Sequence, residues 1–171
     1  MNKTKIEWCD YTINPVKGLY PVDCKDNRGT NTFIFLTKQP QNLPRRFPDN
    51  CWVGVSATNE IEWISARFYL KEVQATVKFI SFEPLLTSML ITSATLPRIG
   101  VSWVIIGQQT PVSAETSPQI SWVREIVEAA DKAGIPVFLK NNLWNLLHEK
   151  AWDDDIFWAT GKAKLRQEFP K

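Results

Sequence analysis

Short apolar runs recur along this chain, and they restrict the possible folds more than any other feature of the sequence. They occupy residues 33–36, 52–55, 77–82, 101–106 and 137–139. Continuous runs of this length that are rich in Val, Ile and Phe are typical of strands buried on both faces of a parallel sheet. A further strand is expected within residues 6–12.

Helical patterns lie between several of these runs. In residues 121–134 apolar side chains recur at helical spacing on one face, and Gly134 supplies a left-handed stop. Asn59 followed by Glu62 predicts a capping box at the start of a second helix. Strands that alternate with helices predict an α/β fold, here a parallel sheet of five to six strands with flanking helices.

The whole chain, residues 1–171, is expected to form a single α/β domain. Residues 1–31 would supply a strand and a loop, residues 32–150 the repeated strand–helix units, and residues 151–171 a C-terminal extension. A closed eight-stranded barrel is not expected, because such a barrel usually needs roughly 200 residues or more.

Charge and residue content narrow the class of protein. Twenty Lys and Arg against eighteen Asp and Glu leave a net charge of +2, which does not favour nucleic acid as a partner. Three cysteines without a Cys-x-x-Cys pair, and one histidine, disfavour a disulfide scaffold and a metal site. With no apolar leader and no apolar stretch long enough to cross a bilayer, we expect a cytoplasmic protein. The eight tryptophans are expected mainly in the core, with nucleobase stacking as the alternative.

Polar side chains follow each expected strand, at the edge where parallel strands present their carboxyl ends and where α/β proteins bind ligands. The candidate ligand-binding residues are Lys38, Ser56, Asn59, Glu83, Gln108, Gln109, Lys140 and Asn142. Glu83 and Lys140 lie beside apolar runs, so we expect both to be partly desolvated and paired with each other or with a ligand. The favoured reading of this pair is a structural ion pair, and Asn59 is expected to be a helix cap rather than a ligand contact. Catalytic residues stay unknown, because the sequence has no G-x-S-x-G, H-E-x-x-H or G-x-G-x-x-G motif.

Several blocks of sequence carry a family resemblance. They are Lys5-Ile6-Glu7-Trp8-Cys9-Asp10-Tyr11-Thr12, Asn14-Pro15-Val16 with Gly18, Phe35 to Pro40, Trp52 to Ser56, Ser81-Phe82-Glu83-Pro84-Leu85-Leu86, Trp103 to Gly107 and Gly134 to Lys140. Together these blocks resemble a phage-associated family of radical-SAM-like proteins, mostly of unknown function. The resemblance implies a radical-SAM-like partial barrel, and in complete members it implies S-adenosylmethionine and a [4Fe–4S] cluster held by three cysteines.

The chain departs from that family at the cluster motif. Tyr20 stands where the resemblance places the first cysteine, Cys24 is the candidate remnant of the second, and the Cys-Tyr-Ala block of the third is absent. The chain therefore resembles an internally deleted, cluster-less member. We expect no cofactor and no metal, with S-adenosylmethionine and the cluster only if the parental activity survives.

These observations lead to three hypotheses about function. The favoured one is a non-catalytic binding or interaction module of phage or prophage type. The alternatives are an enzyme, either of radical-SAM type or with repurposed chemistry at the strand ends, and a nucleic-acid-binding module. A sheet with missing units leaves an edge strand, so we expect a homo-oligomer or a protein partner at that edge. The tryptophan-rich C-terminal region could instead cover the edge within the chain.

Overall fold

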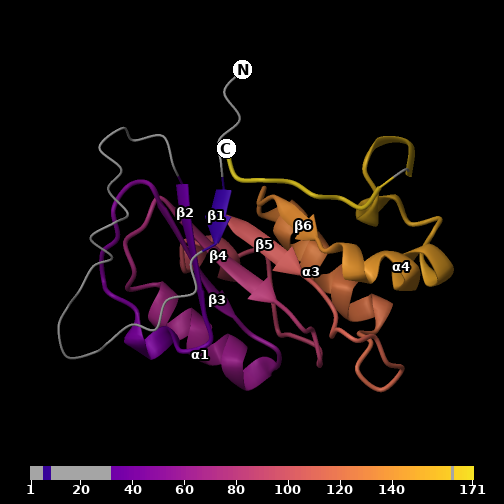
Figure 1. Cartoon of the computed structure of the whole chain (residues 1–171), viewed down its shortest axis with the longest axis horizontal. Helices are drawn as coiled ribbons and strands as arrows, with labels where there is room; N and C mark the ends of the chain where they lie inside the picture. Colours follow the sequence, from indigo (N-terminus) through magenta and orange to yellow (C-terminus); the bar gives the residue numbers. More distant parts are fainter. Residues whose placement is uncertain (1–5, 9–31, 163) are drawn as a thin grey trace.

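The fold is known from a computed structural model that describes residues 6–8, 32–162 and 164–171. A parallel sheet of six strands forms its centre, and each strand pairs with the strands before and after it in the chain (Figure 1). The strands are β1 (Ile6–Trp8), β2 (Thr32–Thr37), β3 (Cys51–Ser56), β4 (Val77–Phe82), β5 (Trp103–Ile106) and β6 (Val137–Leu139). The predicted α/β class is confirmed, and the sheet formed by the described residues does not close into a barrel.

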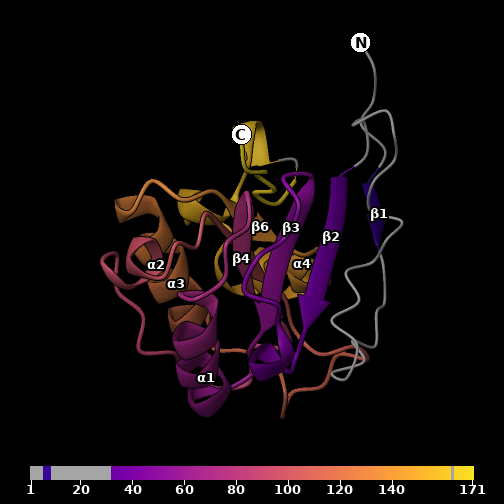
Figure 2. The ribbon, with the colours of Figure 1, turned by 90° about the vertical axis from the view of Figure 1, so that its left-hand side faces the viewer.

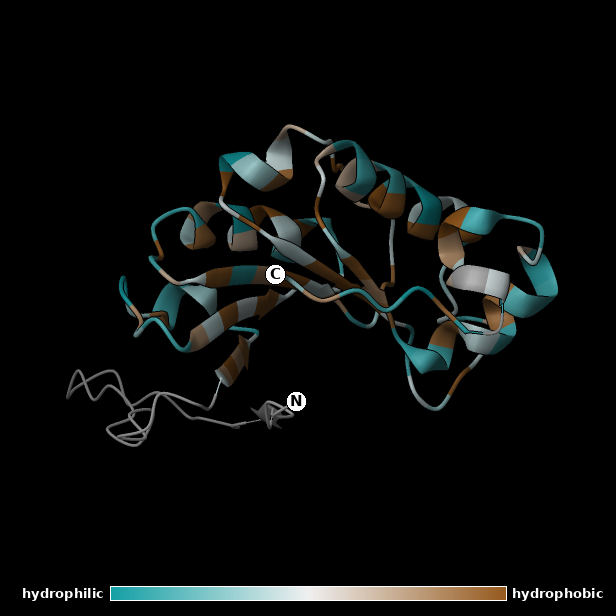
Figure 3. Cartoon of the chain, turned by 90° about the horizontal axis from the view of Figure 1, so that it is seen from above, coloured by the Kyte–Doolittle hydropathy of each residue, from teal (hydrophilic) through white to brown (hydrophobic). Residues whose placement is uncertain are grey.

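Helices and 3-10 turns connect the strands and follow the last of them. They are η2 (Pro40–Asn42), α1 (Glu60–Leu70), α2 (Thr95–Arg98), α3 (Ile120–Lys132), η3 (Asn141–Leu143), α4 (Trp144–Lys150), η4 (Asp155–Phe157) and η5 (Thr160–Lys162). Seen from above, most of the helical segments lie along one side of a curved sheet (Figure 3). None of the described helices is long and apolar enough to span a membrane.

The two longest helices begin and end for reasons visible in the sequence. Asn59 caps α1 by accepting a hydrogen bond from the Glu62 N–H at 3.0 Å, and the Glu62 carboxylate accepts one from the Thr58 N–H at 2.7 Å. The first of these bonds satisfies an N–H group that the first turn would otherwise leave open, and the second holds the residue before the cap. Helix α3 ends before Gly134, which has a φ of +68° in the left-handed region that favours glycine.

The two faces of the sheet are different because successive side chains of a strand point to opposite sides. On one face the strands pack against the helices and form the larger core, which includes Val55, Ile80, Phe82, Val104 and Ile106. The opposite face carries the residues that alternate with these. We call it the aromatic face and define it by Ile34, Trp52, Val77, Phe79, Trp103, Ile105 and Phe138.

The C-terminal segment, residues 166–171, runs beside β6 in the antiparallel direction. The Leu139 N–H donates to the Arg166 carbonyl at 2.8 Å, and the Glu168 N–H donates to the Val137 carbonyl at 2.9 Å. Figure 1 shows this segment passing along the sheet toward the C-terminus. The β6 edge is therefore paired within the chain, in line with the alternative that the C-terminal region covers an exposed edge.

Candidate functional site

A pocket of about 500 Å³ lies on the aromatic face and reaches the carboxyl ends of β4 and β6. Its lining is mostly apolar, with three polar residues, Ser81, Glu83 and Lys140. The lining residues are Ile34, Leu36, Ser81, Glu83, Trp103, Ile105, Phe138, Lys140 and Phe169. Ligand sites in α/β proteins commonly combine an apolar lining with a few polar groups at this end of the sheet.

Trp103 is the centre of the aromatic packing in this pocket. Its ring centroid lies 5.4 Å from that of Phe79, 6.0 Å from that of Phe138 and 5.4 Å from that of Phe169. The indole N–H of Trp103 donates to the Glu168 carbonyl at 2.8 Å, which satisfies its polar atom. The floor of the pocket is thus a fixed cluster of rings, one of which comes from the C-terminal segment.

Glu83 and Lys140 meet at the rim of the pocket. Glu83 directly follows β4 and Lys140 directly follows β6, and their Oε1 and Nζ atoms are 2.5 Å apart. A quarter of the Glu83 side chain and 42% of the Lys140 side chain are exposed to solvent. The pairing expected from the sequence is present in the structure, and both charges stay within reach of a ligand.

The neighbours of Glu83 fix its position. The Ser56 hydroxyl donates to the Glu83 carbonyl at 3.1 Å, which ties the end of β3 to the end of β4. A Cβ atom on Gly107 would lie 3.0 Å from Glu83 Oε1 and 3.2 Å from Glu83 Cδ. Because Gly107 has no side chain, the carboxylate can lie over the end of β5 and face Lys140.

A second polar group at the same end of the sheet joins Gln108 to Asn142. The Asn142 side-chain amide donates to the Gln108 carbonyl at 2.7 Å, and the Gln108 N–H donates back to Asn142 Oδ1 at 3.3 Å. The Gln108 side-chain amide also donates to the Asn142 carbonyl. Gln108 is buried, so these bonds fasten the β5 end to the turn after β6. Their role in the structure is to hold the rim together.

The structure separates the remaining candidates from the pocket. Asn59 caps α1, as expected, and its side-chain oxygen is engaged by the Glu62 N–H. Lys38 and Gln109 are exposed and do not line the pocket. Cys24 lies outside the described residues. Among the described residues, no three His, Cys, Asp or Glu side chains are grouped so that they could hold a metal ion.

Our reading of the sequence missed the aromatic lining of the pocket. Trp103 lies in the apolar run of β5, and Phe138 lies in that of β6. In a strand every second side chain points to the same face, and this period of two could have shown that both residues point away from the helices. Ser81 shares this period of two with Glu83, which it precedes by two residues. Phe169 carries no such signal, because its position depends on how the C-terminal segment crosses the sheet.

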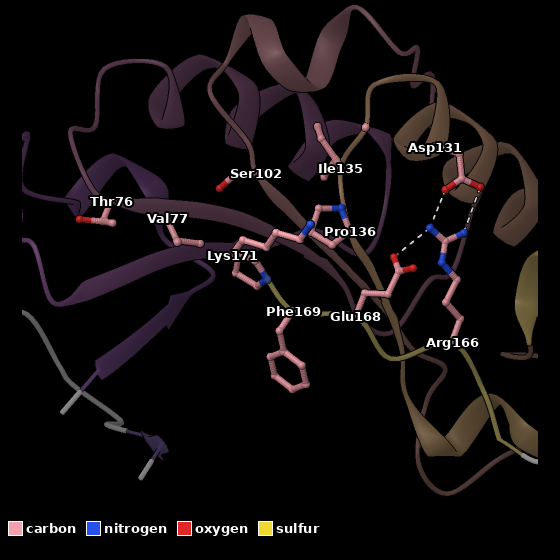
Figure 4. Close-up of a pocket in the computed structure, with 12 residues that line it drawn as sticks. Thr76, Val77, Ser102, Asp131, Ile135, Pro136, Arg166, Glu168, Phe169 and Lys171 are labelled. Carbon is pink, nitrogen blue, oxygen red and sulfur yellow. Dashed lines mark hydrogen bonds and ion pairs between the residues drawn. The ribbon is translucent and has the colours of Figure 1, made fainter. Parts of the chain in front are cut away.

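A larger pocket of about 700 Å³ lies at the amino ends of β4 to β6 (Figure 4). Arg166 forms its polar centre, with two hydrogen bonds to Asp131 at 3.0 and 2.6 Å and one to Glu168 at 2.8 Å. The hydrogen bonds that Arg166 donates to Asp131 raise the pKa of Arg166 further above its ordinary value, although burial opposes them. The three charged side chains engage one another, and together they anchor the C-terminal segment to α3.

Comparison with known proteins assigns a family without a function. No curated protein and no solved structure matches the chain. A family model described as "Protein of unknown function (DUF5131)" matches residues 22–151. Because this match spans well over half of the chain, the protein belongs to the DUF5131 family.

Proposed function

We propose that this protein is a non-catalytic binding module that takes a small molecule in the pocket on the aromatic face. The observation that carries the proposal is the combination of an aromatic floor around Trp103 with a partly exposed ion pair, Glu83 and Lys140, at the rim. A fixed apolar cavity with a few convergent polar groups is the usual form of a ligand site.

The chemistry of the lining defines the class of ligand. A flat ring can stack on or against the edges of Trp103, Phe138 and Phe169. A charged or zwitterionic group on the same ligand would reach Glu83 and Lys140. Its contacts with these two side chains would replace part of the ion pair between them. The proposed ligands are therefore small molecules with an aromatic ring and a charged group, such as nucleotides and S-adenosylmethionine.

The distribution of acid–base groups supports binding rather than catalysis. His148, the only histidine, stacks on Trp144 with ring centroids 5.8 Å apart and does not line the pocket. Ser81 lines the pocket without a histidine beside it that could activate its hydroxyl. Glu83 and Lys140 form an ion pair with each other, so each charge in the pocket already has a partner.

The sequence blocks described above support a more specific origin. We propose that the chain is a shortened relative of phage-associated radical-SAM-like proteins that has lost the cluster motif. Two further features agree with this origin: the parallel sheet in sequential strand order, and the pocket at the carboxyl ends of the strands.

A thermal-shift screen with S-adenosylmethionine and nucleotides tests the proposal. A ligand at about 100 times its Kd stabilises a protein by about 2.7 kcal/mol, which corresponds to a rise in Tm of roughly 5–10 °C for a domain of this size. Glu83→Gln and Lys140→Met should each weaken binding by roughly tenfold or more, because a partly desolvated charged contact is worth about 1.5–3 kcal/mol.

Glu128 and Lys132 provide matched controls. They form an exposed ion pair on α3 at 3.6 Å, outside the pocket, so Glu128→Gln and Lys132→Met change the same charges without touching the site. These controls should bind as the wild type does. If no ligand raises the Tm of the wild type while Glu83→Gln and Lys140→Met lower it, the ion pair is purely structural and the proposal is wrong.

A further inference from the structure

Helix α1 has a second apolar face that no described part of the chain covers. Its inner face is fully buried and consists of Trp63, Ala66 and Leu70. On the other side, Ile61, Ile64 and Phe68 are 81%, 50% and 59% exposed. Their spacing of three and four residues places them on one stripe of the helix. Helix α1 lies at the surface, at the front of Figure 2.

The outward face of α3 is charged, as is usual for a helix face that is exposed to solvent. Helix α3 packs on the same core as α1, but its outward residues include Glu125, Glu128 and Lys132, which are exposed. Single exposed apolar residues are common, whereas several along one helical stripe indicate an interaction surface. The contrast between the two helices therefore marks α1 as a contact face.

Leu90 adds a further exposed apolar side chain beside the start of α1. Its N–H donates to the Glu60 carboxylate at 2.8 Å, and its carbonyl accepts a hydrogen bond from the Trp63 indole at 3.2 Å. These two bonds hold Leu90 beside the first turn, and its side chain is 77% exposed. We call Ile61, Ile64, Phe68 and Leu90 the α1 patch.

Charged residues flank the α1 patch on one side only. At about 100° per residue, Glu60, Arg67 and Lys71 fall within about 40° of one another on the helix. Glu60 lies in the first turn, whereas Arg67 and Lys71 lie at the end of the helix. Lys71 Nζ lies 5.1 Å from the Phe68 ring centre, so the basic end borders the patch directly. The flank is thus acidic at one end and basic at the other.

We propose that a second copy of this chain covers the α1 patch, with the two α1 helices antiparallel about a twofold axis. An axis midway between Ile64 and Ser65 brings Ile61 of each copy opposite Phe68 of the other. The same axis brings Glu60 of each copy opposite Arg67 and Lys71 of the other. A twofold contact requires a surface that is complementary to itself, and the order of apolar and charged residues along α1 meets this requirement. A parallel twofold arrangement would put the two charged flanks on opposite sides of the contact, so that they could not pair.

Sedimentation velocity over a range of micromolar concentrations tests the dimer. The patch is small compared with a standard interface, so we expect a weak dimer with a micromolar dissociation constant. Ile64→Asp places two carboxylates next to the twofold axis and should leave only monomer. Val112→Asp is the matched control, since Val112 is 57% exposed on a loop outside the patch, and this variant should dimerise as the wild type does.

A charge exchange tests the antiparallel arrangement. Glu60→Lys alone and Lys71→Glu alone should each weaken self-association by several-fold, because each variant places like charges opposite each other. An equimolar mixture of the two variants should form a heterodimer that is tighter than the homodimer of either variant, because it restores opposite charges at positions 60 and 71. Far-UV circular dichroism and the Tm establish that each variant is folded.

Three results would overturn the inference. The first is a wild type that stays monomeric at every concentration, which would mean that another partner or another segment of the chain covers the patch. The second is a dimer that Ile64→Asp does not weaken, which would place the contact elsewhere. The third is a mixture of the two charge variants that associates no better than either variant alone.

Discussion

Gly54 and Phe79 show how single residues shape the aromatic face. They are register partners on β3 and β4, and the Phe79 ring lies over Gly54. A Cβ atom on Gly54 would be 2.2 Å from Phe79 Cε2, a distance that real Cβ contacts do not reach. Phe79 in turn packs on Trp103 at 5.4 Å between ring centroids. The absence of one side chain therefore allows the ring cluster to form.

We predict that Gly54→Ala lowers the free energy of unfolding by about 1–3 kcal/mol, because the added methyl group overpacks a filled site. The second substitution Phe79→Leu, made in the Gly54→Ala background, should recover part of this loss by removing the clashing ring atoms. Urea unfolding of the wild type, the two single variants and the double variant measures both effects. Strict additivity of the two losses would contradict the proposed contact.

Glu168 should stabilise the folded protein only at pH values at which its carboxyl group is ionised. Burial raises the pKa of its carboxyl group, but hydrogen bonds from Arg166 and from the Val137 N–H, with the positive charge of Arg166, outweigh burial and leave the pKa below its ordinary value. The unfolded chain then binds protons more readily than the folded one. The stabilisation is present above the ordinary pKa and is lost as the pH falls through the lower, folded-state value.

We therefore predict that Glu168→Gln loses less stability than the wild type between about pH 5 and pH 3. The difference should be below about 1 kcal/mol, because 44% of the Glu168 side chain is exposed and solvent screens its charge. Thermal unfolding across this pH range measures the two curves. Parallel curves for the two proteins would show that Glu168 is not the titrating group.

At the scale of elements, the C-terminal segment contacts both the aromatic face of the sheet and helix α3 on the opposite face. It pairs the β6 edge, contributes Phe169 to the aromatic floor and places Arg166 against α3. Hairpin-like contacts before it bury Trp158 and Leu165 in the larger core. The segment is therefore part of the fold, although the sequence reading treated residues 151–171 as an extension to the strand–helix units.

Removal of residues 166–171 should destabilise the protein by more than about 2 kcal/mol, because it opens the β6 edge and uncovers Trp103 and Phe138. The shortened protein should also aggregate more readily, since an unpaired strand edge invites pairing with other chains. Removal of residues 170–171 alone is the control and should have little effect, because the bonds to β6 stay in place. Thermal unfolding and light scattering distinguish the two. Equal stability of both shortened proteins would mean that the edge pairing is dispensable.

At the scale of the whole molecule, the question is whether the protein carries an iron–sulfur cluster. A cluster of the kind that the resemblance implies takes three thiolates, and only Cys24 lies in the expected part of the sequence. Cys51 is fully buried at the start of β3, in the cluster of apolar residues around Phe33 and Val53. Its surroundings are those of a core residue.

We predict that anaerobic reconstitution leaves the protein without a stoichiometric cluster. Iron and sulfide analysis with the visible absorbance spectrum measures the outcome, and Cys24→Ala is the matched variant that should behave as the wild type does. Stoichiometric iron and sulfide in the wild type, lost in Cys24→Ala, would favour the enzyme hypothesis over the binding module.

The apolar runs and helical periods of the sequence were sufficient to predict the α/β class, the parallel sheet and the bounds of β2 to β6 to within two residues. They were sufficient because these features depend on residues that are close together in the chain. A strand buried on both faces is a continuous apolar run, and a helix begins at a capping residue such as Asn59 before α1. The meeting of Glu83 with Lys140 was also predictable, since parallel strands end at one edge. The pairing of β6 with residues 166–168, the ring of Phe169 in the pocket and the exposed stripe of α1 were not. Each of these depends on which distant segment crosses a given face, and that is decided by contacts between residues far apart in the chain.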